Sequence, residues 1–438
     1  MIKRLVVIVI AIISCQSYAQ EGTASPYSFY GIGSLRFKGT VENRSMGGLS
    51  VYIDSVHVNL RNPASYVGKN LEGLPYDSES RPVKYTVAGS HTNLKLSNGS
   101  TSQNANSSTF DYFAVSIPMG KFGFGLGALP FTSVGYRLED VTSTGDIENR
   151  YRGEGGLNKV FAGLGYQLTD KLGIGVDVNY NFGNIQNSAI AFLYDSEGNL
   201  LQFQTRENNR SDLSGLSFNI GLSYKTMISD KLELSTTATY SPESNLTSQN
   251  ERSLSTITIN AFTGQEFEVN TIEADLAAQN LQETDLTLPS RWSIGAGIGE
   301  PRHWFVGAEY TFTNTSSFDN PIFDISNSTF ENASGIAVGG FYIPNYNSFN
   351  GYFKRVVYRA GFRYEGTGLN INNESINEFG ISFGVGLPLG GLFANNVNIG
   401  FEYGQRGTTN QNLIKEDFFS LNFSLSLNDR WFKKRKYN

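Results

Sequence analysis

Near the end of the chain, Phe418-Phe419-Ser420-Leu421-Asn422-Phe423-Ser424-Leu425-Ser426-Leu427-Asn428 alternates between large apolar and small polar side chains. Successive side chains of a strand point to opposite faces, so this pattern predicts a β-strand with one apolar and one polar face. Transmembrane β-barrels contain such strands with the apolar face toward lipid, and soluble β-sandwiches contain them with the apolar face toward a core. The alternation alone therefore leaves two fold classes open.

The same alternation recurs in the segments 172–182, 216–224 and 379–387. Their polar faces carry mostly Gly, Ser and Asn, which suit a crowded or wet lumen. Tyr and Phe cluster near the expected strand ends, as in the aromatic girdles of membrane barrels. These features favour an all-β, antiparallel transmembrane β-barrel in the bacterial outer membrane over a soluble sandwich.

The composition excludes several other classes of protein. The 438 residues include 17% charged and 13% aromatic residues and 47 Gly, whereas soluble domains carry about 25% charge. Abundant aromatic residues argue against disorder, and the Gly and aromatic content argues against a helical bundle. Because no Pro-rich or low-complexity linker divides the chain, one large closed unit is expected.

The first residues have the pattern of a secretory signal peptide. Lys3 and Arg4 precede the apolar run 5–13, and Ser17-Tyr18-Ala19 forms a small-residue site, so cleavage after Ala19 is expected. The alternative is a lipoprotein signal in which Cys15, the single cysteine, is acylated. Cleavage after Ala19 removes that cysteine and changes the net charge from −6 to −8. No later run of apolar residues is long enough for a transmembrane helix.

Fourteen strands can be placed within a barrel domain at 81–430. They are expected at 83–96, 108–118, 121–138, 156–168, 171–194, 200–227, 231–257, 283–299, 303–315, 333–344, 353–367, 375–388, 395–407 and 416–428. Short turns at 119–121, 169–171, 229–231 and 299–302 alternate with longer segments at 97–107, 139–155, 258–282 and 314–332. In outer-membrane barrels the count is even, short turns are periplasmic and long loops are extracellular.

The segment 20–80 does not alternate, and it is rich in Gly and aromatic residues. A fourteen-stranded barrel has a lumen to fill, so this segment is expected to be an N-terminal plug, or hatch. It contains Met46-Gly47-Gly48 and Asn62-Pro63-Ala64. Pro63 fixes its own φ and lacks an N–H, which suits a rigid kink. The kink is either a turn that folds the plug or a latch whose displacement opens a passage.

Those two motifs, together with Leu288-Pro289-Ser290-Arg291-Trp292-Ser293-Ile294-Gly295, resemble the outer-membrane transporter family for long-chain fatty acids and other hydrophobic compounds (FadL-type). The opening Ser25-Pro26-Tyr27-Ser28 and the closing residues 428–437 look like Bacteroidetes-type members. The resemblance implies a hatch bearing the Asn-Pro-Ala motif inside a fourteen-stranded barrel. It also implies that hydrophobic substrates enter from the loops and leave sideways into the membrane.

Charged residues on the inward faces are candidate ligand contacts. In the strand 353–367, Arg355, Arg359 and Arg363 share a parity with Glu365, and the opposite face is apolar. A lipid-facing Arg near mid-membrane would cost about 2–4 kcal/mol, so the basic set is expected inside. The same parity puts further charges in the lumen: Lys159, Arg291, Glu309, Glu378 and Glu402. These charges either pair with each other and the plug, or leave a cation for an anionic head group.

Two of those arginines, Arg359 and Arg363, are the preferred head-group contacts, with Arg291 and Lys159 as further candidates.

Pro130 stands in the middle of the expected third strand and cannot donate to a neighbouring strand. Because unpaired backbone is costly in hydrocarbon, a bulge or a local separation of strands is expected there. One alternative is a simple kink. The other is a lateral gate lined by Phe124, Leu126, Leu129 and Phe131, as the resemblance implies.

Catalytic interpretations have little support. His57, His91 and His303 lack a second His or Cys at metal-ligand spacing, so neither a metal nor a cofactor is expected. Ser90 and His91 are the candidates for a phospholipase pair, but adjacent residues point to opposite faces of a strand. The glycine pairs Gly31-x-Gly33 and Gly125-x-Gly127 lack the following helix of a phosphate loop. The chain is expected not to be an enzyme.

The residues 431–438 form a basic tail that includes Lys433-Lys434-Arg435-Lys436. A periplasmic tail near anionic lipid head groups is expected, with a protein-docking tail as the alternative. Nucleic acid is not an expected partner, because of the location and the net negative charge. Two functions remain open: a channel for hydrophobic small molecules, and a structural or accessory barrel that binds an outer-membrane protein partner in a larger assembly.

Overall fold

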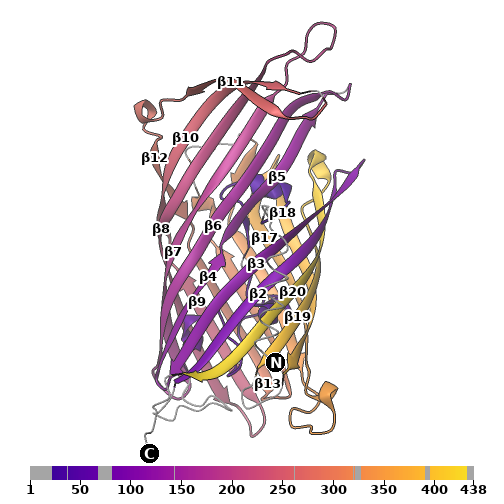
Figure 1. Ribbon diagram of the computed structural model, residues 1–438. Helices are drawn as coiled ribbons and strands as arrows, with labels where there is room; N and C mark the ends of the chain where they lie inside the picture. The colour runs from indigo at the N-terminus through magenta and orange to yellow at the C-terminus, as the bar shows by residue number, and fades with distance from the viewer. Residues whose placement is uncertain are drawn as a thin grey trace, which may run out of the picture.

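The computed structural model describes residues 22–36, 38–67, 81–142, 144–260, 262–318, 320, 327–389 and 395–431. The expected signal peptide, and the basic tail beyond residue 431, lie outside the described residues. The described chain is a closed, antiparallel barrel with fourteen wall strands (Figure 1). None of the helices in these ranges is long and apolar enough to cross a membrane.

The circuit of the wall runs in chain order. Its strands are β2 (Arg81–Ser97), β3 (Ser102–Met119), β4 (Phe122–Pro130) continued by β5 (Thr132–Val141), β6 (Ile147–Gln167), β7 (Leu172–Ala191), β8 (Gln204–Met227), β9 (Glu233–Ser241) continued by β10 (Ser244–Ile259), β12 (Glu283–Leu288) continued by β13 (Arg291–Glu300), β14 (Trp304–Thr313), β16 (Ala333–Tyr342), β17 (Val357–Ile371), β18 (Glu374–Pro388), β19 (Asn396–Arg406) and β20 (Lys415–Trp431).

Short elements complete the structure. They are η1 (Pro26–Phe29), β1 (Ser34–Leu35), α2 (Val41–Arg44), η2 (Pro63–Tyr66), β11 (Glu266–Glu273), η3 (Ala277–Gln279), η4 (Thr315–Ser317), β15 (Ser328–Phe330), η5 (Tyr352–Lys354) and η6 (Asn410–Asn412).

The last strand closes the barrel. β20 pairs with β2 from Arg81↔Trp431 to Ser97↔Lys415, so the wall begins and ends at the same end of the barrel. Along β20, Phe419 and Leu421 are 46% and 41% exposed, whereas Ser420 and Asn422 are buried. The alternating sequence therefore has its apolar face outward and its polar face toward the lumen. The outer-membrane barrel predicted from the sequence is confirmed.

Two outer loops are much shorter than predicted. The expected loop at 97–107 is a turn at 98–101, and the expected loop at 139–155 is a turn at 142–146. The strands continue beyond the apolar band, and their outer ends pair through backbone hydrogen bonds. The side chains there are mostly polar on both faces, so the sequence shows no apolar–polar alternation. The predicted loop at 258–282 contains β11, which pairs with β10.

Three wall strands that were predicted as single are interrupted. β4 and β5 separate at Phe131, β9 and β10 at Pro242-Glu243, and β12 and β13 at Pro289-Ser290. A proline stands at or beside each break, because it withholds a ladder hydrogen bond. The strand predicted at 353–367 starts later, at Val357, so Arg355 lies after η5 beside the Tyr352 ring and is not part of the inward row.

Residues 22–36 and 38–67, here called the N-terminal segment, lie inside the barrel (Figure 1). α2 packs against β18, β19 and β20, and η2 packs against β4, β6, β7 and β8. Thr40 caps α2, since its side chain accepts from the backbone of Asn43 in a capping box. Most of the N-terminal segment is buried, and it fills the lumen between opposite walls.

Candidate functional site

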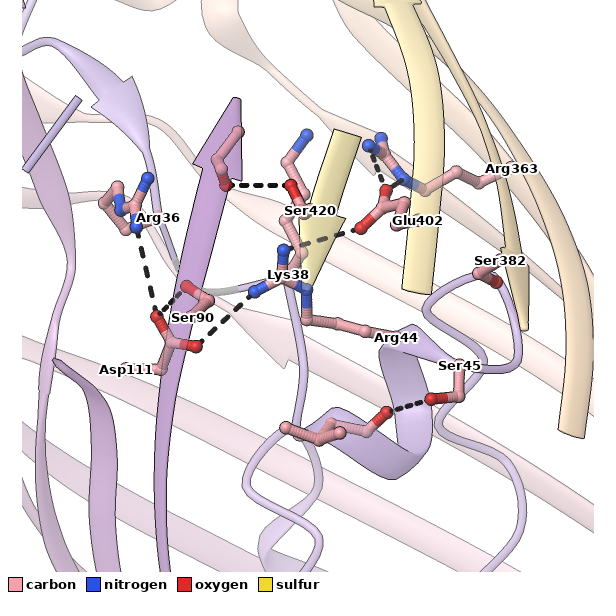
Figure 2. Close-up of polar contacts among 12 residues, drawn as sticks. Arg36, Lys38, Arg44, Ser45, Ser90, Asp111, Arg363, Ser382, Glu402 and Ser420 are labelled. Carbon is pink, nitrogen blue, oxygen red and sulfur yellow. Dashed lines mark hydrogen bonds and ion pairs between the residues drawn. The ribbon is translucent and has the colours of Figure 1, made fainter. Parts of the chain in front are cut away.

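The N-terminal segment is tied to the barrel wall by ion pairs. Arg44 Nη1 lies 3.7 Å from Oδ2 of Asp111 on β3, and Nη2 lies 3.4 Å from Oε2 of Glu402 on β19. Arg36 also pairs with Asp111, at 3.9 Å. Figure 2 shows these side chains converging from the segment, β3 and β19. A single guanidinium, that of Arg44, thus connects β3 with β19, which are separated in the wall by β2 and β20.

Arg363 belongs to this ionic cluster and not to an open site. Its Nη2 lies 2.7 Å from Oε1 of Glu402, and it also pairs with Glu378. Glu378 in turn pairs with Lys38 and Arg406. Burial lowers the pKa of Lys38, with Arg363 acting in the same direction and Glu378 opposing them. The cluster holds cations and carboxylates together where the N-terminal segment meets the wall.

Arg359 lies deeper in a hydrogen-bonded chain. Its Nη1 donates to Oδ1 of Asn398 at 3.1 Å, and Nδ2 of Asn398 donates to Oε1 of Glu42 at 2.6 Å. Glu42 also accepts from the hydroxyls of Ser424 and Ser426. Arg359 therefore helps to hold α2 against the wall.

The Met46-Gly47-Gly48 motif makes a close backbone contact. Gly47 and Gly48 have φ of 72° and 89°, which L residues with side chains rarely adopt. The Gly47 N–H donates to Oγ of Ser382 at 2.9 Å. A Cβ added to Gly361 on the wall would overlap the Met46 and Gly47 backbone. Glycines on both partners therefore allow this turn to lie directly on β17.

The Asn62-Pro63-Ala64 motif is also a fitted turn. Oδ1 of Asn62 accepts from the Ala64 N–H at 3.0 Å, and its Nδ2 donates to the Leu222 carbonyl of β8 at 2.9 Å. Pro63 occupies the first position of η2. A Cβ added to Gly175 would overlap the backbone of Pro63 and Ala64.

Inward glycines of β4 and β6 leave room for the next ring in the segment, that of Tyr66. A Cβ on Gly125 would lie 2.5 Å from atoms of that ring, and one on Gly163 would lie 2.6 Å from it. The Gly-rich alternation of the sequence thus shapes a seat for the N-terminal segment.

A cavity of about 330 Å³ remains between the N-terminal segment and the wall. Apolar and aromatic groups line much of it: Tyr30, Ile32, Leu60, Leu129, Phe131 and Phe161. Lys159 and Arg291 also line it, and among the described residues neither cation has an ion pair within 4 Å. The Lys159 ammonium lies 4.2 Å from the centre of the Phe131 ring. The cavity therefore combines an apolar lining with two cations that have no carboxylate within 4 Å among the described residues, although Asp177, Glu365 and Glu378 also line it.

Asp177 faces the same cavity and was missed in the sequence analysis. It is 3% exposed, and its Oδ1 has no hydrogen-bond partner among the described residues. Its place in the alternating segment 172–182 predicted an inward side chain, but nothing in the sequence indicated that it would face a cavity. Arg359 and Arg363 do not line this cavity.

The wall is discontinuous beside Pro130. β3 pairs with β4 from Phe113↔Ala128 to Met119↔Phe122, and in the described chain no pairing joins β3 to β5. β5 instead pairs with the N-terminal segment at Ser34↔Ser133 and Leu35↔Thr132. The part of the wall between Ser102–Phe110 of β3 and β5 is called the seam; Figure 1 shows the two strands diverging there.

The backbone turns at Phe131. Its N–H donates to the Leu157 carbonyl of β6 at 2.7 Å, while its carbonyl accepts from the Arg36 N–H at 3.0 Å. Because N–H groups alternate in direction along a strand, the nitrogen of Pro130 faces the side of β3. Beyond this point Thr132 to Tyr136 are buried on both faces, so the strand has bent inward.

The predicted gate residues divide into two groups. Leu129 and Phe131 line the cavity, whereas Phe124 and Leu126 are 43% and 46% exposed on the outer face of β4.

A second discontinuity was not foreseen. β8 pairs with β10 up to Ser214 and with β9 from Ile220, and residues 215–219 lie between these ladders. Pro242 and Pro289 stand in the facing breaks, and both line the cavity. Both prolines were visible in the sequence.

The three histidines and the other metal-ligand residue types form no metal centre among the described residues. No cluster of three or more His, Cys, Asp or Glu there could hold a metal. His57 contacts Asp54 at 2.6 Å inside the N-terminal segment, His91 contacts Oγ of Ser108 at 2.7 Å, and His303 contacts Glu300 at 3.0 Å.

A family model described as BamG matches residues 1–438 of the chain. A comparison of the sequence with curated proteins gives no match. Among solved structures, the chain is similar to a Pseudomonas aeruginosa FadL homologue at 14% identity and a TM-score of 0.55, covering 90% of this chain and 99% of that chain.

Two toluene transporters have similar folds. Pseudomonas putida TodX matches at 14% identity and a TM-score of 0.54, covering 91% of this chain and 99% of that chain. Ralstonia pickettii TbuX matches at 16% identity and a TM-score of 0.52, covering 88% and 97%. At these identities the likeness supports the FadL-type barrel fold.

Proposed function

The chain belongs to the BamG family, and we propose that it is an outer-membrane barrel that binds a hydrophobic small molecule with an anionic head group and passes it sideways into the membrane. The observation that carries the proposal is the cavity of about 330 Å³ with an apolar lining and two cations, Lys159 and Arg291. Arg291 is exposed to the lumen and Lys159 is half-buried, so an anionic head group that enters the cavity can form charge-assisted hydrogen bonds with both.

The position of the cavity supports the release of the ligand sideways through the wall. Leu129 and Phe131 line the cavity and stand at the strand break beside Pro130, where β3 and β5 lose contact. An apolar tail extending from the cations would meet these two side chains before it reached lipid. TbuX and TodX are toluene transporters, and we extend the transport of a hydrophobic compound to this chain as a hypothesis.

The proposal is tested by titrating the purified barrel with decanoate and with methyl decanoate. Lys159→Gln and Arg291→Gln should each weaken decanoate binding by about 10- to 100-fold, since a charge-assisted hydrogen bond contributes about 1.5–3 kcal/mol. Binding of the uncharged ester should not change. Lys121→Gln is the matched control, because Lys121 is exposed in the turn before β4. Equal decanoate affinity in all variants would refute the head-group site.

A second function, that of a structural or accessory barrel in a larger outer-membrane assembly, is favoured by a different observation. Arg44 pairs with Asp111 of β3 and Glu402 of β19, and Arg61 pairs with Glu309 of β14 across the barrel, so the N-terminal segment is fastened to the wall at these strands. A segment fixed on opposite walls suits a permanently closed barrel. An accessory barrel should bind neither decanoate nor its ester, whereas the binding protein should bind at least one.

A further inference from the structure

The outer part of β3 has a free backbone edge. Residues 102–110 pair with β2 from Ser97↔Ser102 to Gly89↔Phe110, but the pairing of β3 with β4 begins only at Phe113. Within the described chain, no strand pairs with the other edge of these nine residues. A closed barrel normally leaves no such edge, because each wall strand has a neighbour on both sides.

This edge also lacks the usual protection against strand pairing. Exposed edges in native proteins carry Lys, Pro or inward-pointing charges that discourage a further strand. Residues 102–109 read Ser-Gln-Asn-Ala-Asn-Ser-Ser-Thr, with neither charge nor proline. Their backbone pairs regularly with β2, and the first register shift comes at Ala88/Gly89, where Asp111 is the extra residue. The edge is thus a regular template about nine residues long.

The position of the edge indicates what can occupy it. Residues 102–109 carry no large apolar side chain on either face, and large apolar side chains begin at Phe110, which is 48% exposed. The edge therefore lies beyond the hydrocarbon layer, on the outer side. Acyl chains cannot pair with N–H and C=O groups, so a backbone is the occupant that matches.

The chain's own described segments leave the edge open. β1 reaches the seam, but it pairs with Thr132 and Ser133 of β5.

A second copy of the chain does not fit either. Two copies in one membrane are related by an axis along the membrane normal. Barrel strands tilt by about 35–45° from that normal, so this operation would make two β3 strands cross instead of running side by side. A continuous ladder between two β3 edges is therefore excluded by geometry.

We propose that the outer edge of β3, residues 102–110, is a β-augmentation site for an extended segment of a different protein at the cell surface. The partner strand would hydrogen-bond through its backbone and meet small, uncharged Ser, Asn and Thr side chains on either side. It would end near Asp111, where the bulge interrupts the register. This inference does not depend on the proposed ligand site, which lies deeper in the lumen.

The test compares amide hydrogen exchange in two preparations in the same detergent: barrel refolded alone, and tagged full-length barrel extracted from native outer membranes. The native preparation should show exchange of residues 102–110 slowed by about tenfold or more, since bonded amides exchange only on local opening. Residues 205–213 of β8, which pair on one edge with β7 and on the other with β10, should exchange equally in both.

Native mass spectrometry of the same samples should show one added protein chain of a different mass. Asn104→Lys combined with Asn106→Lys should abolish both the protection and the added mass, while Thr205→Lys on β8 should preserve both. Heat-modifiable migration on gels confirms that each variant forms a barrel. Equal exchange in the two preparations would overturn the inference. So would protection without added protein, or added mass equal to a second copy.

Discussion

Ser34 of the N-terminal segment pairs in antiparallel register with Ser133 of β5, on the edge that β3 leaves at the seam. The same segment carries Arg36 and Arg44, which hold Asp111 of β3 on the opposite side of the seam. Both borders of the seam are therefore bonded to one stretch of about ten residues in the lumen. Displacement of the N-terminal segment would release both borders together.

Breaking the β1–β5 pairing should loosen the seam. Ser34→Pro removes an N–H that faces β5, since the Arg36 N–H two residues later donates to the Phe131 carbonyl, so β1 can no longer continue the edge of β5. Uptake of a hydrophobic probe by cells should rise, while the heat-modifiable barrel band persists. Leu168→Pro, in the turn after β6, is the control and should leave uptake unchanged. If Ser34→Pro left uptake at the parent level, β1 would not restrain the seam.

Pro130→Val should reduce uptake of the same probe several-fold. The new N–H would face β3 and extend the ladder beyond Ala128, narrowing the route past Leu129 and Phe131. Pro242→Val is the matched variant at the second break in the wall. Reduced uptake in Pro242→Val alone would place the exit between β8 and β10, and it would contradict an exit at the seam.

Seating of the N-terminal segment should depend on inward glycines. Gly125→Val places side-chain atoms where the Tyr66 ring lies, so it should displace η2 and raise ion conductance of the barrel in planar bilayers. Gly335→Ala is the control, since the nearest atom to its added Cβ would be 3.5 Å away. Unchanged conductance in Gly125→Val would show that the lumen is closed without η2.

Arg363→Gln should destabilise the barrel without affecting decanoate binding. Removal of one partner from a buried ion cluster leaves uncompensated carboxylates and costs about 3–5 kcal/mol. Thermal unfolding in detergent should therefore shift to lower temperature. The double variant with Glu402→Gln should recover part of the loss, because the two residues are coupled. Weakened decanoate binding in Arg363→Gln would instead show that Arg363 contributes to the ligand site.

The sequence predicted the barrel because alternation is a local property of each strand. Phe419 and Ser420 lie on the faces that their parity requires, and the inward parity of Arg359 and Arg363 agrees with their burial. Parity gives the face of a residue but not its neighbours across the lumen. The sequence therefore could not show that Arg363 pairs with Glu378 and Glu402 while Arg291 has no carboxylate within 4 Å in the described part of the chain.

The extent of the outer strands was also beyond sequence reasoning. Ser102 to Thr109 pair with β2 through their backbone groups. Their side chains do not alternate between apolar and polar, so the sequence gives no sign of a strand there. Pro130 predicted a discontinuity, but the inward turn at Phe131 depends on Arg36, about a hundred residues earlier in the chain.

The head-group site in the cavity is tested most directly by native mass spectrometry of barrel purified from outer membranes in mild detergent. The account predicts one bound acidic, largely apolar molecule per barrel, retained by Lys121→Gln and lost when Lys159→Gln and Arg291→Gln are combined. A barrel that carries no such molecule, or a double variant that retains it in equal amount, would contradict the account.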